Sequence, residues 1–111
     1  MKKLFTNYNF TLDKNDKRLL TSFCKQVIKQ LDGEEKFFME VRAFNSILDK
    51  LNGNSEVIKL TKDERTRLVN QLEENVKYLK KKLDKSWIFK KWIYKSLYNQ
   101  YETVLEKHFK G

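Results

Sequence analysis

Few side chains in this sequence are suited to catalysis. The chain contains one cysteine, Cys24, and one histidine, His108, which are too few for a zinc site with the usual set of ligands. Cys24 falls on the apolar stripe of an expected helix, where burial raises the pKa of a thiol and makes it a poor nucleophile. His108 falls near the inward side of the last expected helix, which predicts either a partly buried histidine or one on a fraying C-terminal turn, with a structural role in both cases.

Acidic residues occur in adjacent pairs that could in principle bind a metal or transfer protons: Glu34–Glu35, Asp63–Glu64 and Glu73–Glu74. Neighbouring residues on a helix do not share a face, and the first two pairs lie at predicted helix starts, where the helix dipole favours negative charge. The sequence also lacks a phosphate-binding loop, a dinucleotide-binding motif and a paired-histidine zinc motif. We therefore predict a protein that is not an enzyme, with no cofactor, no metal and no small-molecule substrate.

The most unusual stretch is residues 76–95, which combine both tryptophans with a local charge of +7 from eight lysines and one aspartate. On a helical wheel, Trp92 and Ile88 point away from the core side, on which we place Ile93. We predict a partner-binding surface made of Trp87, Ile88, Lys91, Trp92 and Lys95. Alternatively, the N-terminal residues 4–8 cover these side chains, which then serve only the fold.

Three kinds of partner suit such a surface. A protein partner or a second copy of the chain would bury the tryptophans as anchors inside a rim of lysines. Nucleic acid or an anionic membrane surface would instead attract the positive charge. The candidate nucleic-acid-binding residues are Lys77, Lys80, Lys81, Lys82, Lys85 and Lys90.

The net charge of +9 is weak evidence for nucleic-acid binding, because 20 of the 24 basic residues are lysine and only four are arginine. Arginine is the residue that grips phosphate and guanine with two hydrogen bonds. Residues with AT-rich codons are abundant, which indicates an AT-rich genome, bacterial or phage, that supplies lysine at solvated positions. The leading prediction is a non-catalytic binding or regulatory protein that acts on a protein partner. Nucleic-acid binding is the alternative.

Hydrophobic periodicity predicts four helices, at about residues 14–31, 34–51, 62–84 and 86–109. Asp13 or Thr11 can cap the first helix, and Thr61 and Glu64 form a capping box that opens the third. Gly33 and Gly53 follow the first two helices, where glycine commonly adopts the left-handed conformation. We expect one helical domain over residues 1–111, with residues 1–7 as a flexible segment.

Residues 8–12 and 57–60 alternate apolar and polar side chains, as short strands do. The two halves of the chain also align at an offset of 48 residues, which places Phe10 on Ile58 and suggests a tandem β-α-α duplication. Amphipathic helices in general align this way, so both explanations stay open. If the strands pair, Asn9, Thr11 and Lys59 line the face opposite the core, and such a ribbon fits the DNA major groove.

Together these patterns predict an all-α fold, a four-helix bundle of two antiparallel helical hairpins with, at most, a minimal two-stranded ribbon. No apolar run approaches the length of a membrane-spanning helix, and Met1–Phe5 lead into polar residues rather than a secretory hydrophobic region. We therefore expect a cytoplasmic protein.

Overall fold

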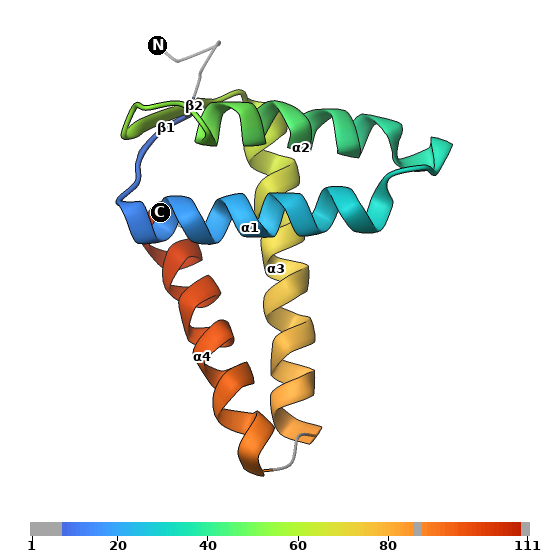
Figure 1. Ribbon diagram of the computed structural model, residues 1–111, viewed down its shortest axis with the longest axis vertical. Coiled ribbons are helices and arrows are strands. Elements are labelled where there is room, and N and C mark those ends of the chain that lie inside the picture. The colour runs from blue at the N-terminus through green and yellow to red at the C-terminus, as the bar shows by residue number, and fades with distance from the viewer. Residues whose placement is uncertain (1–7, 86–87, 110–111) are drawn as a thin grey trace. The chain divides into compact units, whose positions relative to one another are not determined.

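The computed structural model describes residues 8–85 and 88–109, and it is mostly helical with a small antiparallel sheet (Figure 1). The predicted flexible segment, residues 1–7, lies outside the described residues. In chain order the elements are β1 (Tyr8–Thr11), α1 (Lys14–Leu31), the 3-10 turn η1 (Glu35–Phe37), α2 (Phe38–Leu51), β2 (Val57–Leu60), α3 (Lys62–Lys85), α4 (Ile88–Val104) and the π-helical turn η2 (Leu105–Phe109).

The chain divides into two compact units, Met1–Leu68 and Val69–Gly111. The boundary falls inside α3, so the first turns of that helix belong to the first unit and the rest to the second. No helix within residues 8–85 and 88–109 is long and apolar enough to cross a membrane.

The first unit is built on the antiparallel pair α1 and α2, which lie alongside each other (Figure 1). Each helix buries one apolar stripe, as the helical periodicity predicts. The buried apolar residues of this unit are Leu12, Leu20, Phe23, Cys24, Val27, Ala43, Phe44, Ile47, Leu51, Ile58, Leu60 and Leu68.

Side-chain caps fix the start of α1 and of α3. The Asp13 carboxylate accepts a hydrogen bond from the Asp16 backbone N–H at 2.8 Å, so Asp13 is the N-cap of α1. Thr61 and Glu64 form the predicted capping box, in which each side chain accepts a hydrogen bond from the other residue's N–H, at 2.9 and 3.1 Å. These caps explain why both helices begin where the sequence predicts.

The ends of the first two helices differ from each other. Gly33 follows α1 with φ +95°, the left-handed conformation that glycine tolerates and that the sequence predicts. For Gly53 the same prediction is wrong, because its φ is not positive. Instead, α2 ends with the Asn52 N–H bonded to the Leu48 carbonyl at 2.9 Å, and the Gly53 N–H bonded to the Lys50 carbonyl at 3.3 Å.

Two predicted helices are less regular than expected. The helix predicted over residues 34–51 begins with the separate turn η1, and α2 follows it from Phe38, with no side-chain cap hydrogen bond from Glu34 or Phe37. The helix predicted over residues 86–109 is described from Ile88, and its last residues form the π-helical turn η2.

The two strands pair into an antiparallel ribbon, which settles a question that the sequence left open. In the register, Tyr8 lies opposite Leu60 and Phe10 lies opposite Ile58. The Leu12 N–H extends the pairing with a 2.9 Å hydrogen bond to the Glu56 carbonyl. Alternation along the strands buries Ile58 and Leu60 and leaves the opposite face exposed.

The second unit contains α4, η2 and the larger part of α3. Its buried residues are Leu72, Leu79, Tyr101, Val104, Leu105 and Phe109. The prediction that Ile93 faces the core is wrong, because 46% of Ile93 is exposed. On the wheel of α4 the less exposed stripe runs through Tyr94, Leu97 and Tyr101, so the inward side is rotated away from Ile93 and lies opposite Trp92.

Candidate functional site

The strongest candidate site is a surface of the second unit that combines exposed aromatic and basic side chains. Its apolar members are Tyr78, Trp92 and Ile93, which are 53%, 67% and 46% exposed. Its lysines are all exposed: Lys77, Lys80, Lys81, Lys82, Lys85, Lys90, Lys91 and Lys95. We call these eleven residues the basic-aromatic surface.

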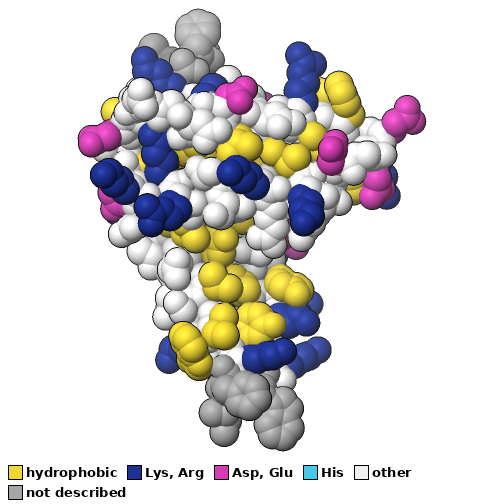
Figure 2. Space-filling model, viewed as in Figure 1, with side chains coloured by type: hydrophobic (Ala, Val, Ile, Leu, Met, Phe, Trp, Pro, Cys, Tyr) yellow, Lys and Arg dark blue, Asp and Glu magenta, His cyan; other side chains and the backbone are white. Residues whose placement is uncertain are grey.

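Two helices contribute to the basic-aromatic surface at the end of the unit where α3 stops and α4 begins. Lys77–Lys85 lie on the last turns of α3, and Lys90–Lys95 lie on the first turns of α4. Figure 2 shows apolar side chains exposed over α4, with lysines close by at the same end. Of the predicted partner-binding residues, Lys91, Trp92 and Lys95 are exposed. Trp87 and the side chain of Ile88 lie outside what the structure describes.

The lysine side chains of the basic-aromatic surface are exposed to solvent, and the contacts that two of them make with Glu74 and Tyr78 are weak. The ion pair between Lys77 Nζ and Glu74 Oε2 spans 3.5 Å, and both side chains are 72% exposed, so it contributes little to stability. The ammonium of Lys82 lies 5.5 Å from the centre of the Tyr78 ring, a cation–π contact that holds an exposed aromatic ring next to a positive charge. The local field of this surface is therefore positive.

This arrangement suits recognition, because it places positive charge and exposed apolar area on the same surface. The single acidic residue within 76–95 is Asp84. An exposed indole beside lysines can be desolvated by a partner, while the lysines attract negative charge over longer distances.

The single cysteine and the single histidine lie outside the basic-aromatic surface, and each is at least partly buried in the fold. Cys24 is fully buried, and burial raises the pKa of its thiol to about 12, as the apolar stripe of α1 predicts. His108 is half-buried in η2, with its ring edge-on to Phe109 at 6.2 Å between centroids. Among the described residues, no cluster of His, Cys, Asp and Glu could hold a metal ion.

Among the predicted acidic pairs, Asp63 and Glu64 serve the fold. Glu64 is 7% exposed and accepts hydrogen bonds from Ser46 Oγ at 2.5 Å and Lys50 Nζ at 2.6 Å, besides the Thr61 N–H. Burial raises the pKa of this carboxyl, but hydrogen bonds from Lys50, Ser46 and Thr61 and the Lys50 charge outweigh burial and hold the pKa below its ordinary value. The Asp63 carboxylate pairs with the Arg67 guanidinium, with 3.0 Å between Asp63 Oδ2 and Arg67 Nε.

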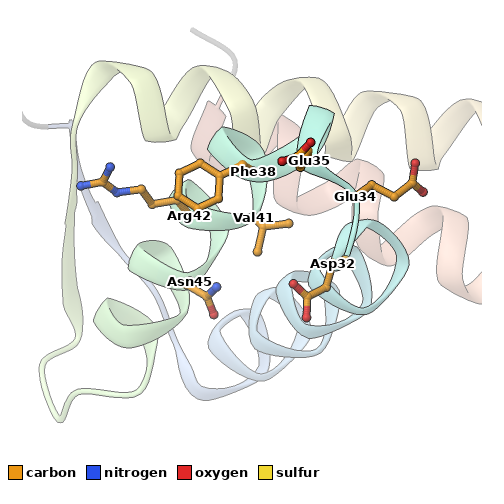
Figure 3. Close-up of a pocket in the computed structure, with 8 residues that line it drawn as sticks. Asp32, Glu34, Glu35, Phe38, Val41, Arg42 and Asn45 are labelled. Atoms are coloured by element: carbon orange, nitrogen blue, oxygen red, sulfur yellow. The ribbon is translucent and has the colours of Figure 1, made fainter.

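A shallow groove in the first unit was not predicted from the sequence. It has a volume of about 700 Å³ and is lined by Asp32, Gly33, Glu34, Glu35, Phe38, Val41, Arg42 and Asn45. Figure 3 shows Arg42 and Glu34 at opposite ends, with Phe38 and Val41 between them. The one sequence signal is Phe38, which flanks the buried stripe of α2 and is 62% exposed. The acidic residues of the groove, Asp32, Glu34 and Glu35, lie between the end of α1 and the start of α2, where the dipole at a helix start favours negative charge.

No family model, curated protein or solved structure matches this chain.

Proposed function

We propose that this chain is a small non-catalytic binding or regulatory protein whose basic-aromatic surface contacts an acidic face of a protein partner. The observation that carries the proposal is the exposure of Trp92, 67%, between the exposed lysines Lys91 and Lys95. Tryptophan is among the residues that most often dominate the energy of an interface, and burying it against a partner removes a large apolar area from water.

Lysines around Trp92 then form the rim of the interface. Rim charges contribute mainly to the rate of encounter, since they steer an acidic partner toward the surface and are screened by salt. Ile93 and Tyr78 extend the apolar contact area on the two helices. A second copy of the chain is the other protein partner that the exposed Trp92 would suit, and it would make the protein a homodimer.

Affinity capture with the full chain as bait, from a nuclease-treated lysate of the native host, tests the proposal. We expect a protein to be retained by the unmodified chain and by Phe38→Ala, but not by Trp92→Ala. Phe38 is a matched control because it is also an exposed aromatic residue, 62% exposed, in the first unit. Equal retention by all three baits would contradict the proposal.

The alternative is that the same surface binds nucleic acid, favoured by the exposure of all eight lysines. Replacing Lys80, Lys81 and Lys82 by glutamate should then abolish binding to DNA or RNA, and the logarithm of affinity should fall steeply and linearly with the logarithm of salt concentration. A protein interface anchored by Trp92 should lose mainly its association rate as salt rises. Retention on anionic vesicles, but not on neutral ones, would identify a membrane surface instead.

We further propose that the four helices pack as one bundle of two antiparallel hairpins, α1 with α2 and α3 with α4, in a single cytoplasmic domain. The close packing of α1 with α2 supports the first hairpin, and the free thiol of Cys24 suits a reducing compartment. A single cooperative unfolding transition, seen equally by far-ultraviolet circular dichroism and tryptophan fluorescence, would support one domain. Two separate transitions would contradict it.

A further inference from the structure

The outer face of the β1–β2 ribbon carries four exposed side chains, three of them polar, that do not pack in the core. Its residues are Asn9 and Thr11 from β1 and Val57 and Lys59 from β2, and all four are exposed. The opposite face carries the buried Ile58 and Leu60 and belongs to the core. The outer face therefore presents an amide, a hydroxyl, an ammonium and one apolar side chain to solvent.

This ribbon has an approximate two-fold symmetry that two independent observations support. The strand register places Phe10 opposite Ile58, and the offset of 48 residues that aligns the two halves of the sequence also relates Phe10 to Ile58. The axis that exchanges the strands therefore passes through this pair. Equivalent residues have equivalent burial: Leu12 and Leu60 are 3% and 2% exposed, and Leu20 and Leu68 are 2% and 1% exposed.

The same symmetry places charges on both sides of the ribbon. Lys14 and Lys62 are the first residues of α1 and α3, are separated by the same 48 residues, and are both exposed. Acidic side chains next to them are engaged in the fold, since Asp13 caps α1 and Asp63 pairs with Arg67. Two equivalent exposed cations thus stand at the starts of the helices that follow the two strands.

We propose that the outer face of this ribbon docks into the major groove of double-stranded DNA, a function separate from that of the basic-aromatic surface. A two-stranded ribbon has the width that the major groove admits, about 12 Å. The duplex also has local two-fold axes perpendicular to its length, so a two-fold ribbon presents equivalent positions to both DNA strands. Lys14 and Lys62 are placed to neutralise phosphates on the two sides of the groove.

The side chains of the outer face fit base edges better than they fit a protein surface. Asparagine can make two hydrogen bonds to adenine, lysine donates to guanine, and threonine and valine can contact the thymine methyl group. Val57, 41% exposed, is the single apolar residue of the four, which is too little apolar area for a protein anchor. The deep and narrow major groove of double-stranded RNA does not admit side chains in this way.

The two halves of the ribbon are not identical, which predicts the kind of site that it reads. The two-fold axis exchanges Asn9 with Val57 and Thr11 with Lys59. The two halves of the DNA site would therefore contact different side chains. A symmetric dimer reads a palindrome, whereas this ribbon should prefer an imperfect palindrome with one altered half-site.

Selection from a random-sequence duplex library with the full chain, followed by fluorescence anisotropy on the enriched duplex, tests the proposal. We expect Asn9→Ala/Thr11→Ala/Lys59→Ala to weaken binding roughly tenfold or more. The matched control, Ser22→Ala/Lys25→Ala/Gln26→Ala, removes one charge and two polar side chains from the exposed face of α1 and should bind as the unmodified chain does. Circular dichroism checks that both variants are folded.

A symmetrised variant sharpens the test. Val57→Asn/Lys59→Thr gives both strands the same outward residues, so the selected sequence should become a better palindrome. The proposal would be overturned by a selection without sequence enrichment, by an unchanged motif for the symmetrised variant, or by equal losses in the two triple variants. It would also be overturned if Lys80→Glu/Lys81→Glu/Lys82→Glu abolished binding while the ribbon variant did not. Trp92→Ala should leave DNA binding intact, which separates this proposal from the proposed function.

Discussion

The two units of the chain use their charged residues in different ways. All four arginines lie in Met1–Leu68, whereas Val69–Gly111 contains ten lysines and no arginine. In the first unit, Arg67 bridges Glu40 at 2.6 Å and Asp63 at 3.0 Å, and Lys50 pairs with the buried Glu64. In the second unit, the lysines around Trp92 are exposed. Arg67 and Lys50 thus hold elements of the first unit together, while the lysines around Trp92 lie at the surface of the second.

Two aromatic residues, one from each unit, also differ in how far folding removes them from water. Phe44 in the first unit is fully buried, whereas Trp92 in the second is 67% exposed. A large apolar side chain stabilises a fold only to the extent that folding removes it from water. The contrast therefore predicts that changes at Phe44 and at Trp92 affect different measurements.

The largest effect on stability is expected at Phe44. Phe44→Ala should lower the free energy of unfolding by about 3–5 kcal/mol, because it removes a buried ring and leaves a cavity among α1 and α2. Urea unfolding of the variant and of the unmodified chain measures the difference. A change of less than about 1 kcal/mol would show that this core is not the main source of stability.

A smaller loss, with a pH dependence, is expected at Glu64. Glu64→Gln should cost about 1–3 kcal/mol at neutral pH, since it weakens the bonds to Lys50 and Ser46. The pKa of Glu64 is lowered from 4.5 in the fold. Its ionised form therefore stabilises the fold above that value, and the contribution is lost as the pH falls below 4.5 and through the lower folded pKa.

Unfolding measured between neutral and acidic pH checks the sign of this dependence. The stability difference between the unmodified chain and Glu64→Gln should shrink as the pH falls. Glu74→Gln is the control, because the Glu74 side chain is 72% exposed in its ion pair and should change stability little at any pH. A difference that grows on acidification would contradict the account of Glu64.

A still smaller loss is expected from the cap of α1. Asp13→Ala removes the acceptor for the Asp16 N–H and should cost about 1 kcal/mol. Asp13→Asn retains a side-chain acceptor and should recover most of that loss. Thermal unfolding followed by circular dichroism distinguishes the two variants, and equal losses would show that the cap hydrogen bond is not what matters.

Features that depend on a few neighbouring residues were predictable from the sequence. The starts of α1 and α3 were predictable because Asp13 and the Thr61–Glu64 capping box act within one turn. The exposure of Trp92 was predicted correctly even though the core side of α4 was placed at Ile93, because Trp92 lies outside both the predicted and the observed inward stripe. Burial of Cys24 followed from its place among leucine and valine on one face of α1.

Features that depend on packing between distant segments were missed. The strand register depends on how β1 and β2 pair across a long stretch of sequence. The groove lined by residues between Asp32 and Asn45 depends on the turn that joins α1 to α2. Ile93 was misplaced because α4 is apolar around much of its circumference, so periodicity alone does not fix its inward side. The bonds from Lys50 and Ser46 to Glu64 likewise required the tertiary fold.

The smallest effect on stability, and the largest on binding, is expected for Trp92→Ala. Since most of the indole is already in water, the melting temperature should stay close to that of the unmodified chain.

The most direct test of the central claim measures both the melting temperature of Trp92→Ala and its dissociation constant for the captured protein. The account predicts an unchanged melting temperature and a dissociation constant raised about thirtyfold, the loss expected of an interface anchor worth about 2 kcal/mol. A dissociation constant equal to that of the unmodified chain, or a loss of stability of about 3–5 kcal/mol typical of a buried tryptophan, would contradict it.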